Sequence, residues 1–288
     1  MSMTRSLLPA FAVTSLVFLS LVGCSGEAPV ETPTAPVVTP APAAPEAPPN
    51  IAIADLEADA QNVTLVPSPA EMQSAMEKAG IANGLSKLVT ERQLKMDVQN
   101  KDVVAVRTGV VLADCLLTVK DSPKDKLVER LNVVKLGLNT LGAGKDLPAT
   151  IDDLTARINN DGISRDDLVK ELDEMHGAVI PEIKFEAGDR AVPLIQAGSW
   201  LEGSNLVSAA IIAANKPDAG SQLLRQPQVV DYFLKYVQTE GADKAPDAVL
   251  KQLEGTLMKL KEIAAKPALS ADDVKEVKAQ TDSVLALL

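Results

Sequence analysis

The sequence is poor in the side chains that carry most metal chemistry and base recognition. Its 288 residues include one histidine and two cysteines, and aromatic residues make up only 2% of the chain. One histidine leaves too few ligands for a catalytic zinc site, and two cysteines cannot build a disulfide framework. So few aromatic side chains also argue against a platform on which bases could stack. We therefore expect neither a metal ion nor a cofactor.

Basic side chains are scarce as well. Lysine and arginine number 28 against 39 acidic residues, which gives a net charge of -11. Because binding to phosphates requires clustered basic residues, we expect no nucleic-acid partner. The chain has neither a phosphate-binding loop nor a Gly-x-Ser-x-Gly elbow, so we expect a protein that is not an enzyme. The adjacent acids Asp152-Asp153 and Asp272-Asp273 are the remaining alternative, although predicted helix N-termini attract acids there.

The N-terminus has the features of an export signal. Arg5 precedes an apolar segment over residues 6–22, which polar residues interrupt. A membrane-spanning helix needs about 20 apolar residues, so this segment is more typical of a secretory signal. It ends in Leu21-Val22-Gly23-Cys24, which resembles the lipobox of bacterial lipoproteins. The alternative is an ordinary signal peptide with a chance cysteine.

The resemblance implies that residues 1–23 are removed and that Cys24 becomes a lipidated N-terminus. Fatty acyl chains on Cys24 would then anchor the protein to a membrane without a spanning helix. Ser25 follows Cys24, and in Gram-negative lipoproteins a serine at this position favours the outer membrane. Prolines recur from there to residue 50, so we expect residues 24–50 to form an extended tether. The predicted location is the cell envelope.

Residues 51–288 have the pattern of an all-α helical bundle. A hydroxyl residue is followed three positions later by an acid at five places, which predicts five helix N-termini. Apolar residues then recur at a spacing of three or four along single helix faces. The five predicted starts are Ser68, Ser122, Thr150, Ser164 and Ser270, and the two clearest apolar faces are Leu127/Leu131/Val134/Leu138 and Leu250/Leu253/Leu257/Leu260/Ile263.

The helical body resembles itself at an offset of 89 residues. Gly109 and Leu117 correspond to Gly198 and Leu206, and the predicted loops and helix starts follow in the same order. This predicts two tandem units of about four helices, related by a pseudo-two-fold axis. Repeat one would cover about 84–178 and repeat two about 179–288. The alternative is a chance match between helices rich in alanine and leucine.

Two repeated charge pairs are candidates for a functional groove. Asp97/Lys101 and Glu186/Arg190 each place an acid four residues before a base. On helices these would be stabilising surface pairs. The functional alternative places both pairs along a polar groove between the two repeats.

The aromatic residues of the body are the second group of candidates. All of them lie in the second half, and Tyr232, Phe233 and Tyr236 follow one another within a single predicted helix. Clustered aromatic residues usually belong to a core. Together with Trp200, however, Tyr232 and Tyr236 are the best candidates for a binding surface.

The most apolar predicted helix covers residues 103–119 and contains one cysteine and two charged residues. Cys115 is expected to be a buried small hydrophobe rather than a reactive thiol. Arg107 and Asp114 carry charges that must be paired or hydrated. We expect them to pair with neighbours, and a polar cleft is the alternative.

Two hypotheses for the function follow. The leading one is a lipid-anchored envelope protein with a structural or protein-interaction role, whose partner would be another envelope protein. The alternative is a ligand-binding lipoprotein that holds a small molecule between the repeats, near Trp200 and Arg190.

Overall fold

The computed structural model describes residues 66–187, 190–241 and 244–288. Within these ranges every regular element is a helix, so the predicted all-α bundle is confirmed. The elements are α2 (Pro69–Ala79), a short 3₁₀ turn (Leu85–Lys87), α3 (Lys101–Thr118), α4 (Lys124–Leu141), α5 (Asp146–Asn159), α6 (Arg165–Ala187), α7 (Ala191–Ala214), α8 (Asp218–Leu223), α9 (Pro227–Glu240), α10 (Asp247–Ala264) and α11 (Ala271–Leu285). Among the helices of these ranges, none is both long enough and apolar enough to cross a membrane.

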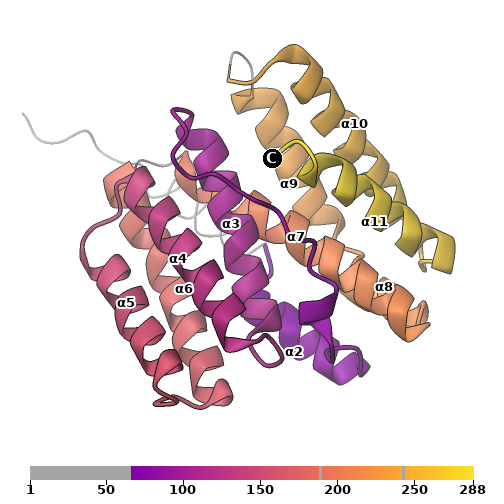
Figure 1. Ribbon diagram of the computed structural model, residues 1–288. Coiled ribbons are helices and arrows are strands. Elements are labelled where there is room, and N and C mark those ends of the chain that lie inside the picture. The colour runs from indigo at the N-terminus through magenta and orange to yellow at the C-terminus, as the bar shows by residue number, and fades with distance from the viewer. Residues whose placement is uncertain (1–65, 188–189, 242–243) are drawn as a thin grey trace, which may run out of the picture. The chain divides into compact units, whose positions relative to one another are not determined.

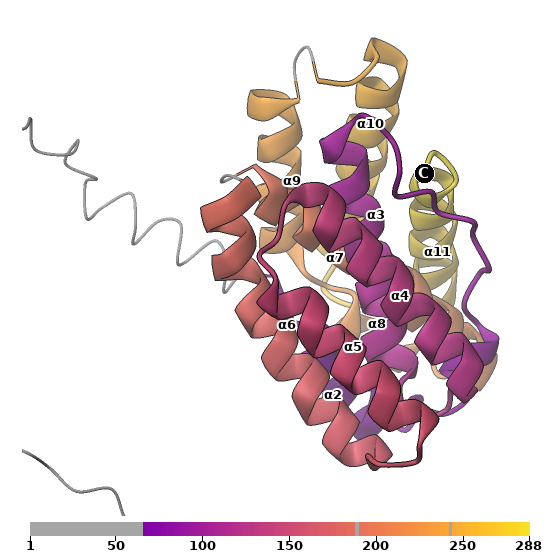
Figure 2. The ribbon, with the colours of Figure 1, turned by 60° about the vertical axis from the view of Figure 1, so that its left-hand side comes forward.

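Helices α3 and α7 form the centre of the bundle. They lie side by side in both views, with α4, α5 and α6 on one side and α9, α10 and α11 on the other (Figures 1 and 2). From Thr108 to Thr118 every residue of α3 is buried, and most of α7 is buried as well. Both helices are rich in apolar and small residues, which suits them to this central position.

Two glycines let α3 and α7 approach closely. A Cβ atom on Gly109 would lie 2.0 Å from the carbonyl oxygen of Ile195, and one on Gly198 would lie 2.0 Å from that of Val106. Ser199 Oγ also donates a hydrogen bond of 2.9 Å to the Gly109 carbonyl. The two glycine contacts are reciprocal at the offset of 89 residues, which is the relationship that an internal two-fold axis produces.

The two halves nevertheless pack differently around this central pair. In the first half α4, the next helix along the chain, packs along α3, whereas in the second half the helix that packs along α7 is the last one, α11. Helix α6 also continues through the predicted boundary between residues 178 and 179. The tandem repeat therefore stays a prediction, supported by the reciprocal glycines but not by the packing of the outer helices.

Three of the five predicted helix starts are confirmed. Ser68 and Ser270 form capping boxes with Glu71 and Asp273, in which side chain and backbone bond reciprocally. Ser164 accepts a hydrogen bond of 3.1 Å from the backbone of Asp167, directly before α6.

At the other two places the predicted cap does not form, although a helix begins close to the first of them. Ser122 is buried, and its hydroxyl bonds to Thr118 at 2.7 Å and to Arg130 at 3.1 Å, so α4 begins two residues later. Thr150 lies inside α5, where its hydroxyl donates to the Asp146 carbonyl at 2.9 Å. In both cases the hydroxyl has another partner than the helix N-terminus that the pattern predicts.

The apolar side chains form two core clusters. The first lies among α3, α4, α5 and α6 and contains the predicted apolar face of α4. The second lies among α2, α7, α9, α10 and α11, and Trp200 and Phe233 belong to it. On α10 the predicted apolar face divides, because Leu257 is buried in this core while Leu250 and Leu253 are only half-buried.

Candidate functional site

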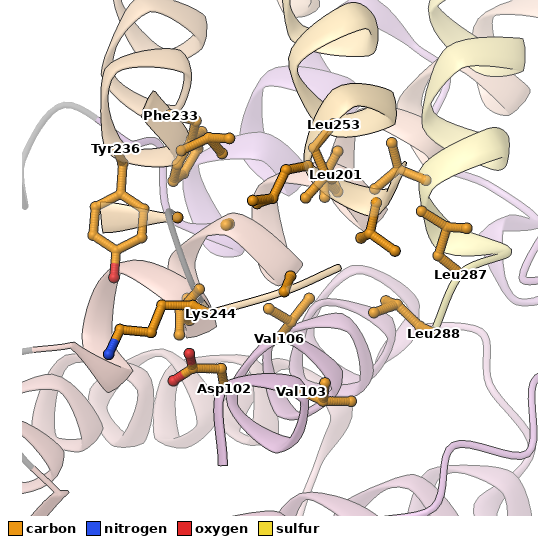
Figure 3. A pocket seen from close by; sticks show the side chains of 18 of the residues that line it. Asp102, Val103, Val106, Leu201, Phe233, Tyr236, Lys244, Leu253, Leu287 and Leu288 are labelled. Carbon is orange, nitrogen blue, oxygen red and sulfur yellow. The ribbon is translucent and has the colours of Figure 1, made fainter. Parts of the chain in front are cut away.

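A cavity of about 330 Å³ lies in the second half of the bundle. It is bounded by the first turns of α3, by α7, α9 and α10, and by the residues after α11 (Figure 3). Most of its lining is apolar. The apolar lining residues include Val103, Val106, Leu194, Ala197, Leu201, Phe233, Val249, Leu250, Leu253, Leu257, Leu287 and Leu288.

The spacing of leucines on α10 explains the apolar surface of the cavity. Leu250, Leu253 and Leu257 lie on one face of the helix, which is directed towards α7 and α3. Helix α9 is held beside them by Phe233, whose ring lies 5.3 Å from the ring of Trp200. A continuous apolar surface from four helices therefore surrounds the space.

One end of the cavity is polar. Arg190 directs Nε and Nη2 to Asp102 Oδ2, each at 2.9 Å, and Nη1 donates to the Glu240 carbonyl at 3.0 Å. The bond to Asp102 raises the pKa of Arg190 further, so its charge is permanent. Figure 3 shows Asp102, Tyr236 and Lys244 together at this end, with Leu253, Leu287 and Leu288 well away from them.

Tyr236 connects the polar end to α9. Its ring faces the guanidinium of Arg190 at 5.9 Å, a cation–π distance, and its hydroxyl lies 3.5 Å from the Arg190 carbonyl. Partial burial raises the pKa of Tyr236, so the hydroxyl keeps its proton at neutral pH. It can therefore donate a hydrogen bond to a molecule in the cavity.

Trp200 lines the cavity from α7. Its side chain is buried, and its Nε1 donates to Gln226 Oε1 at 2.8 Å. Because this bond satisfies the indole N–H, the part of the ring that faces the cavity is apolar. It is the only tryptophan in the sequence, so its fluorescence reports on this cavity.

The structure brings together three of the five candidate binding residues. Trp200, Arg190 and Tyr236 line the same cavity. Lys101 does not belong to the lining and is exposed at the start of α3. Tyr232 is outside the lining too, and its ring packs on Phe233 at a centroid distance of 5.1 Å.

The predicted helical pair Asp97/Lys101 is wrong. Asp97 lies in the non-helical segment before α3, which begins only at Lys101 with Asn100 as its N-cap. Arg190 binds Asp102 instead, and the side chain of Glu186 lies outside the described residues. The sequence reasoning missed Asp102 and Lys244. An asparagine directly before the apolar helix is the signal that could have placed Asp102 in a first helical turn.

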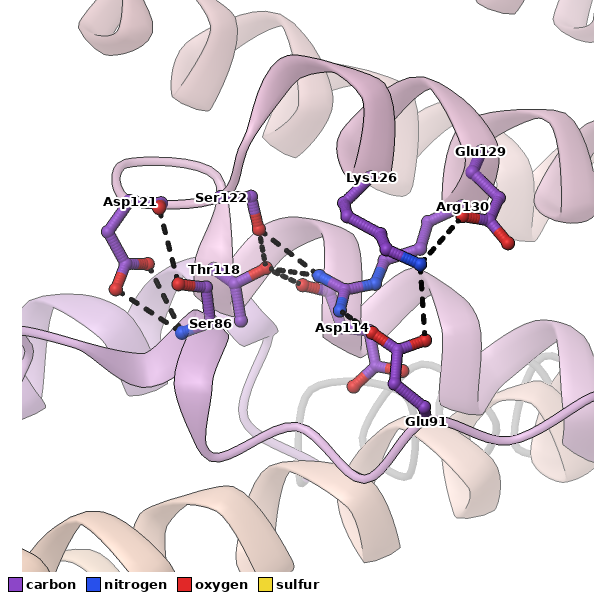
Figure 4. A network of polar contacts seen from close by, with 9 residues as sticks. All are labelled: Ser86, Glu91, Asp114, Thr118, Asp121, Ser122, Lys126, Glu129 and Arg130. Atoms are coloured by element: carbon purple, nitrogen blue, oxygen red, sulfur yellow. Dashed lines mark hydrogen bonds and ion pairs between the residues drawn. The ribbon is translucent and has the colours of Figure 1, made fainter.

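A second polar cluster is buried at the centre of the bundle. Arg130 donates to Thr118 Oγ1 at 3.0 Å and to Ser122 Oγ at 3.1 Å, and it faces Glu91 at 3.7 Å (Figure 4). Asp114 lies beside Arg130 in the same view. This network joins α3 to α4 and to the segment that precedes α3.

Asp114 shares the buried region with a second carboxyl group, that of Glu202 on α7. Burial, followed by the charge of Glu202, raises the pKa of Asp114 well above its ordinary value. Glu202 pairs with Arg92 Nη1 at 2.7 Å. Asp114 Oδ1 and Glu202 Oε1 are buried and accept no hydrogen bond from any other group in the described chain. One proton held by Asp114 and donated to Glu202 accounts for both atoms.

Arg107 and Cys115 occupy structural positions. Arg107 donates to the Lys95 carbonyl at 2.6 Å and to a main-chain oxygen of Leu288. Cys115 is buried as expected, and burial raises the pKa of its thiol far above the ordinary value.

The adjacent acids offer no common reactive centre in the described structure. Asp152 pairs with Lys135 at 2.5 Å, and Asp153 pairs with Arg157 at 3.3 Å. Asp273 caps α11, and Asp272 pairs with Lys275 at 2.9 Å. Across the described residues, no cluster of three or more histidine, cysteine or acidic side chains could hold a metal ion.

No protein-family model, curated protein or solved structure matches this chain. The cavity with its polar end is therefore the feature of the described chain from which a function can be argued. The predicted lipidation site, Cys24, lies outside the described residues.

Proposed function

We propose that this protein is a lipid-anchored envelope protein whose helical body binds a small, mainly apolar molecule. The cavity of about 330 Å³ is the observation that supports this proposal. Its size falls at the lower end of the roughly 300–1,000 Å³ typical of small-molecule sites. An apolar lining with a few polar groups at one end is also typical of such sites.

The positions of the aromatic and basic candidates support ligand binding over a purely structural role. A purely structural helical body needs its aromatic side chains only as core. Here Trp200 and Tyr236 line the cavity together with the ion pair of Arg190 and Asp102. This arrangement favours ligand binding over a purely structural role.

Binding can be tested through the fluorescence of Trp200. We expect emission to change on titration with a panel of apolar metabolites, because the indole ring lines the cavity. Val249→Phe would fill part of the cavity and should abolish the change. The matched control is Met258→Phe, which adds a ring at an exposed position on the same helix. A flat response to the whole panel would favour the structural or protein-interaction role instead.

The membrane anchor needs a separate test. We expect the wild-type protein to partition with membranes and the Cys24→Ser variant to be released into the soluble fraction, because the acyl chains supply the attachment. Sedimentation of the two proteins after cell lysis measures the difference. A Cys24→Ser variant that stays with membranes would overturn the anchor proposal. Separation of inner and outer membranes then tests the expectation that Ser25 directs the protein to the outer membrane.

A further inference from the structure

One basic side chain at the polar end of the cavity has no acidic partner among the described residues. Arg190 is paired with Asp102 at 2.9 Å and with the Glu240 carboxylate at 4.0 Å, and it also bonds to the Glu240 carbonyl, so its N–H groups are largely engaged. Lys244 lies at the same end and is exposed, and it forms no ion pair with any described residue. Lys244 is therefore the basic group that is available to a bound molecule.

The helix N-terminus at the same end does not compete for this role. Asn100 Oδ1 accepts hydrogen bonds from the backbone N–H groups of Asp102 at 3.0 Å and Val103 at 3.3 Å. These first-turn donors of α3 are thus already satisfied by the cap. The hydroxyl of Tyr236 is a second donor at this end, because its contact of 3.5 Å with the Arg190 carbonyl is long for an O–H bond.

The volume limits the apolar part of the ligand. A volume of about 330 Å³ lies at the lower end of the range for small-molecule sites, so we expect one alkyl chain of moderate length rather than the two long chains of a membrane phospholipid. The apolar side chains of Leu250, Leu253 and Leu287 line the space that this chain would occupy.

We propose that the cavity binds a free carboxylic acid with a single alkyl chain of moderate length, its carboxylate facing Lys244 and Tyr236. This inference rests on the proposed function and adds the chemical class of the ligand. The carboxylate receives a charge-assisted bond from Lys244 and a hydrogen bond from Tyr236. The chain lies against the leucines of α10.

The test compares two ligands that differ only in the head group. Decanoate and decanol are titrated into the full chain carrying Cys24→Ser, which is purified without detergent because detergent would compete for the cavity. Binding is followed by Trp200 fluorescence and by calorimetry. We expect Lys244→Gln to weaken decanoate binding about tenfold, equivalent to about 1.4 kcal/mol, and to leave decanol binding unchanged. Lys251→Gln removes an exposed lysine outside the lining and should change neither.

The outcomes separate this inference from the proposed function. If decanoate and decanol bind equally and Lys244→Gln affects neither, the head-group assignment is overturned while the binding function stands. If affinity continues to rise from decanoate to hexadecanoate, the size assignment is overturned. If neither ligand binds and the wider metabolite panel also leaves Trp200 unchanged, the proposed binding function itself falls.

Discussion

The close contact between α3 and α7 makes Gly109→Ala the most direct test of the packing. The added Cβ would lie 2.0 Å from the Ile195 carbonyl oxygen and 2.9 Å from the Ser199 nitrogen, whereas ordinary contacts begin at 3.4 Å. Both atoms are backbone and cannot rotate away, so the helices must separate. Overpacking costs about 1–3 kcal/mol, and alanine recovers about 1 kcal/mol of helix propensity. Weakening the Ser199 bond to the Gly109 carbonyl adds about 1 kcal/mol.

The gain in helix propensity and the loss of the hydrogen bond roughly cancel, so the overpacking cost remains. Because the clash is with backbone atoms, we take the upper part of its range and expect Gly109→Ala to lower the free energy of unfolding by about 2–3 kcal/mol. At roughly 2–4 °C per kcal/mol, Tm should fall by about 5–10 °C. Urea and thermal unfolding followed by circular dichroism measure both quantities. Gly255→Ala on α10 is the control, because no atom lies within 4 Å of its added Cβ, and it should stabilise by up to about 1 kcal/mol. If Gly109→Ala unfolds like the parent while the control gains stability, the contact is wrong.

Three further predictions follow from buried or capping groups. Because the pKa of Asp114 is raised, the folded state holds a proton that the unfolded state releases. The free energy of unfolding therefore falls by up to about 1.4 kcal/mol for each pH unit above the ordinary aspartate pKa. Asp114→Asn should thus be more stable than the parent at pH 7 and no more stable near pH 4 in urea unfolding; identical pH profiles would contradict this. Ser270→Ala removes a capping box and should cost about 1 kcal/mol in the same assay, whereas Thr150→Ala, inside α5, should cost clearly less. Cys115 should react with an aromatic disulfide reagent only as fast as the chain unfolds, and rapid labelling of the native Cys24→Ser protein would refute its burial.

The helical class could be predicted because it depends on local patterns. Capping boxes at Ser68 and Ser270 involve residues three positions apart, so the sequence alone contains both partners. Ser122 follows the same pattern but bonds to Arg130, on the next helix. A helix start was therefore predictable where the hydroxyl bonds to the backbone three residues later, and not where another partner takes that bond, as Arg130 does for Ser122 and the Asp146 carbonyl does for Thr150.

The candidate site was predictable only in part. Trp200 and Tyr236 could be predicted as candidates because aromatic residues are few, and Arg190 because its charge pattern repeats. The bond from Arg190 to Asp102 was not predictable from local spacing, because Asp102 lies in the first turn of α3 and is 88 residues away in the chain. The cavity itself depends on how α9 and α10 pack in the second half, which local spacing does not determine.

The reciprocal glycine contact also has a kinetic consequence. Because each glycine fits against the backbone of the opposite helix, α3 and α7 cannot slide along each other without breaking both contacts. The cavity thus has one stiff side. Its other side is the hairpin of α9 and α10, which packs on the core through Phe233 and Leu257 and is bonded to Arg190 through the Glu240 carbonyl. We expect entry and release of a ligand to follow the opening of that hairpin, so its residence time would be set there rather than in the central helices.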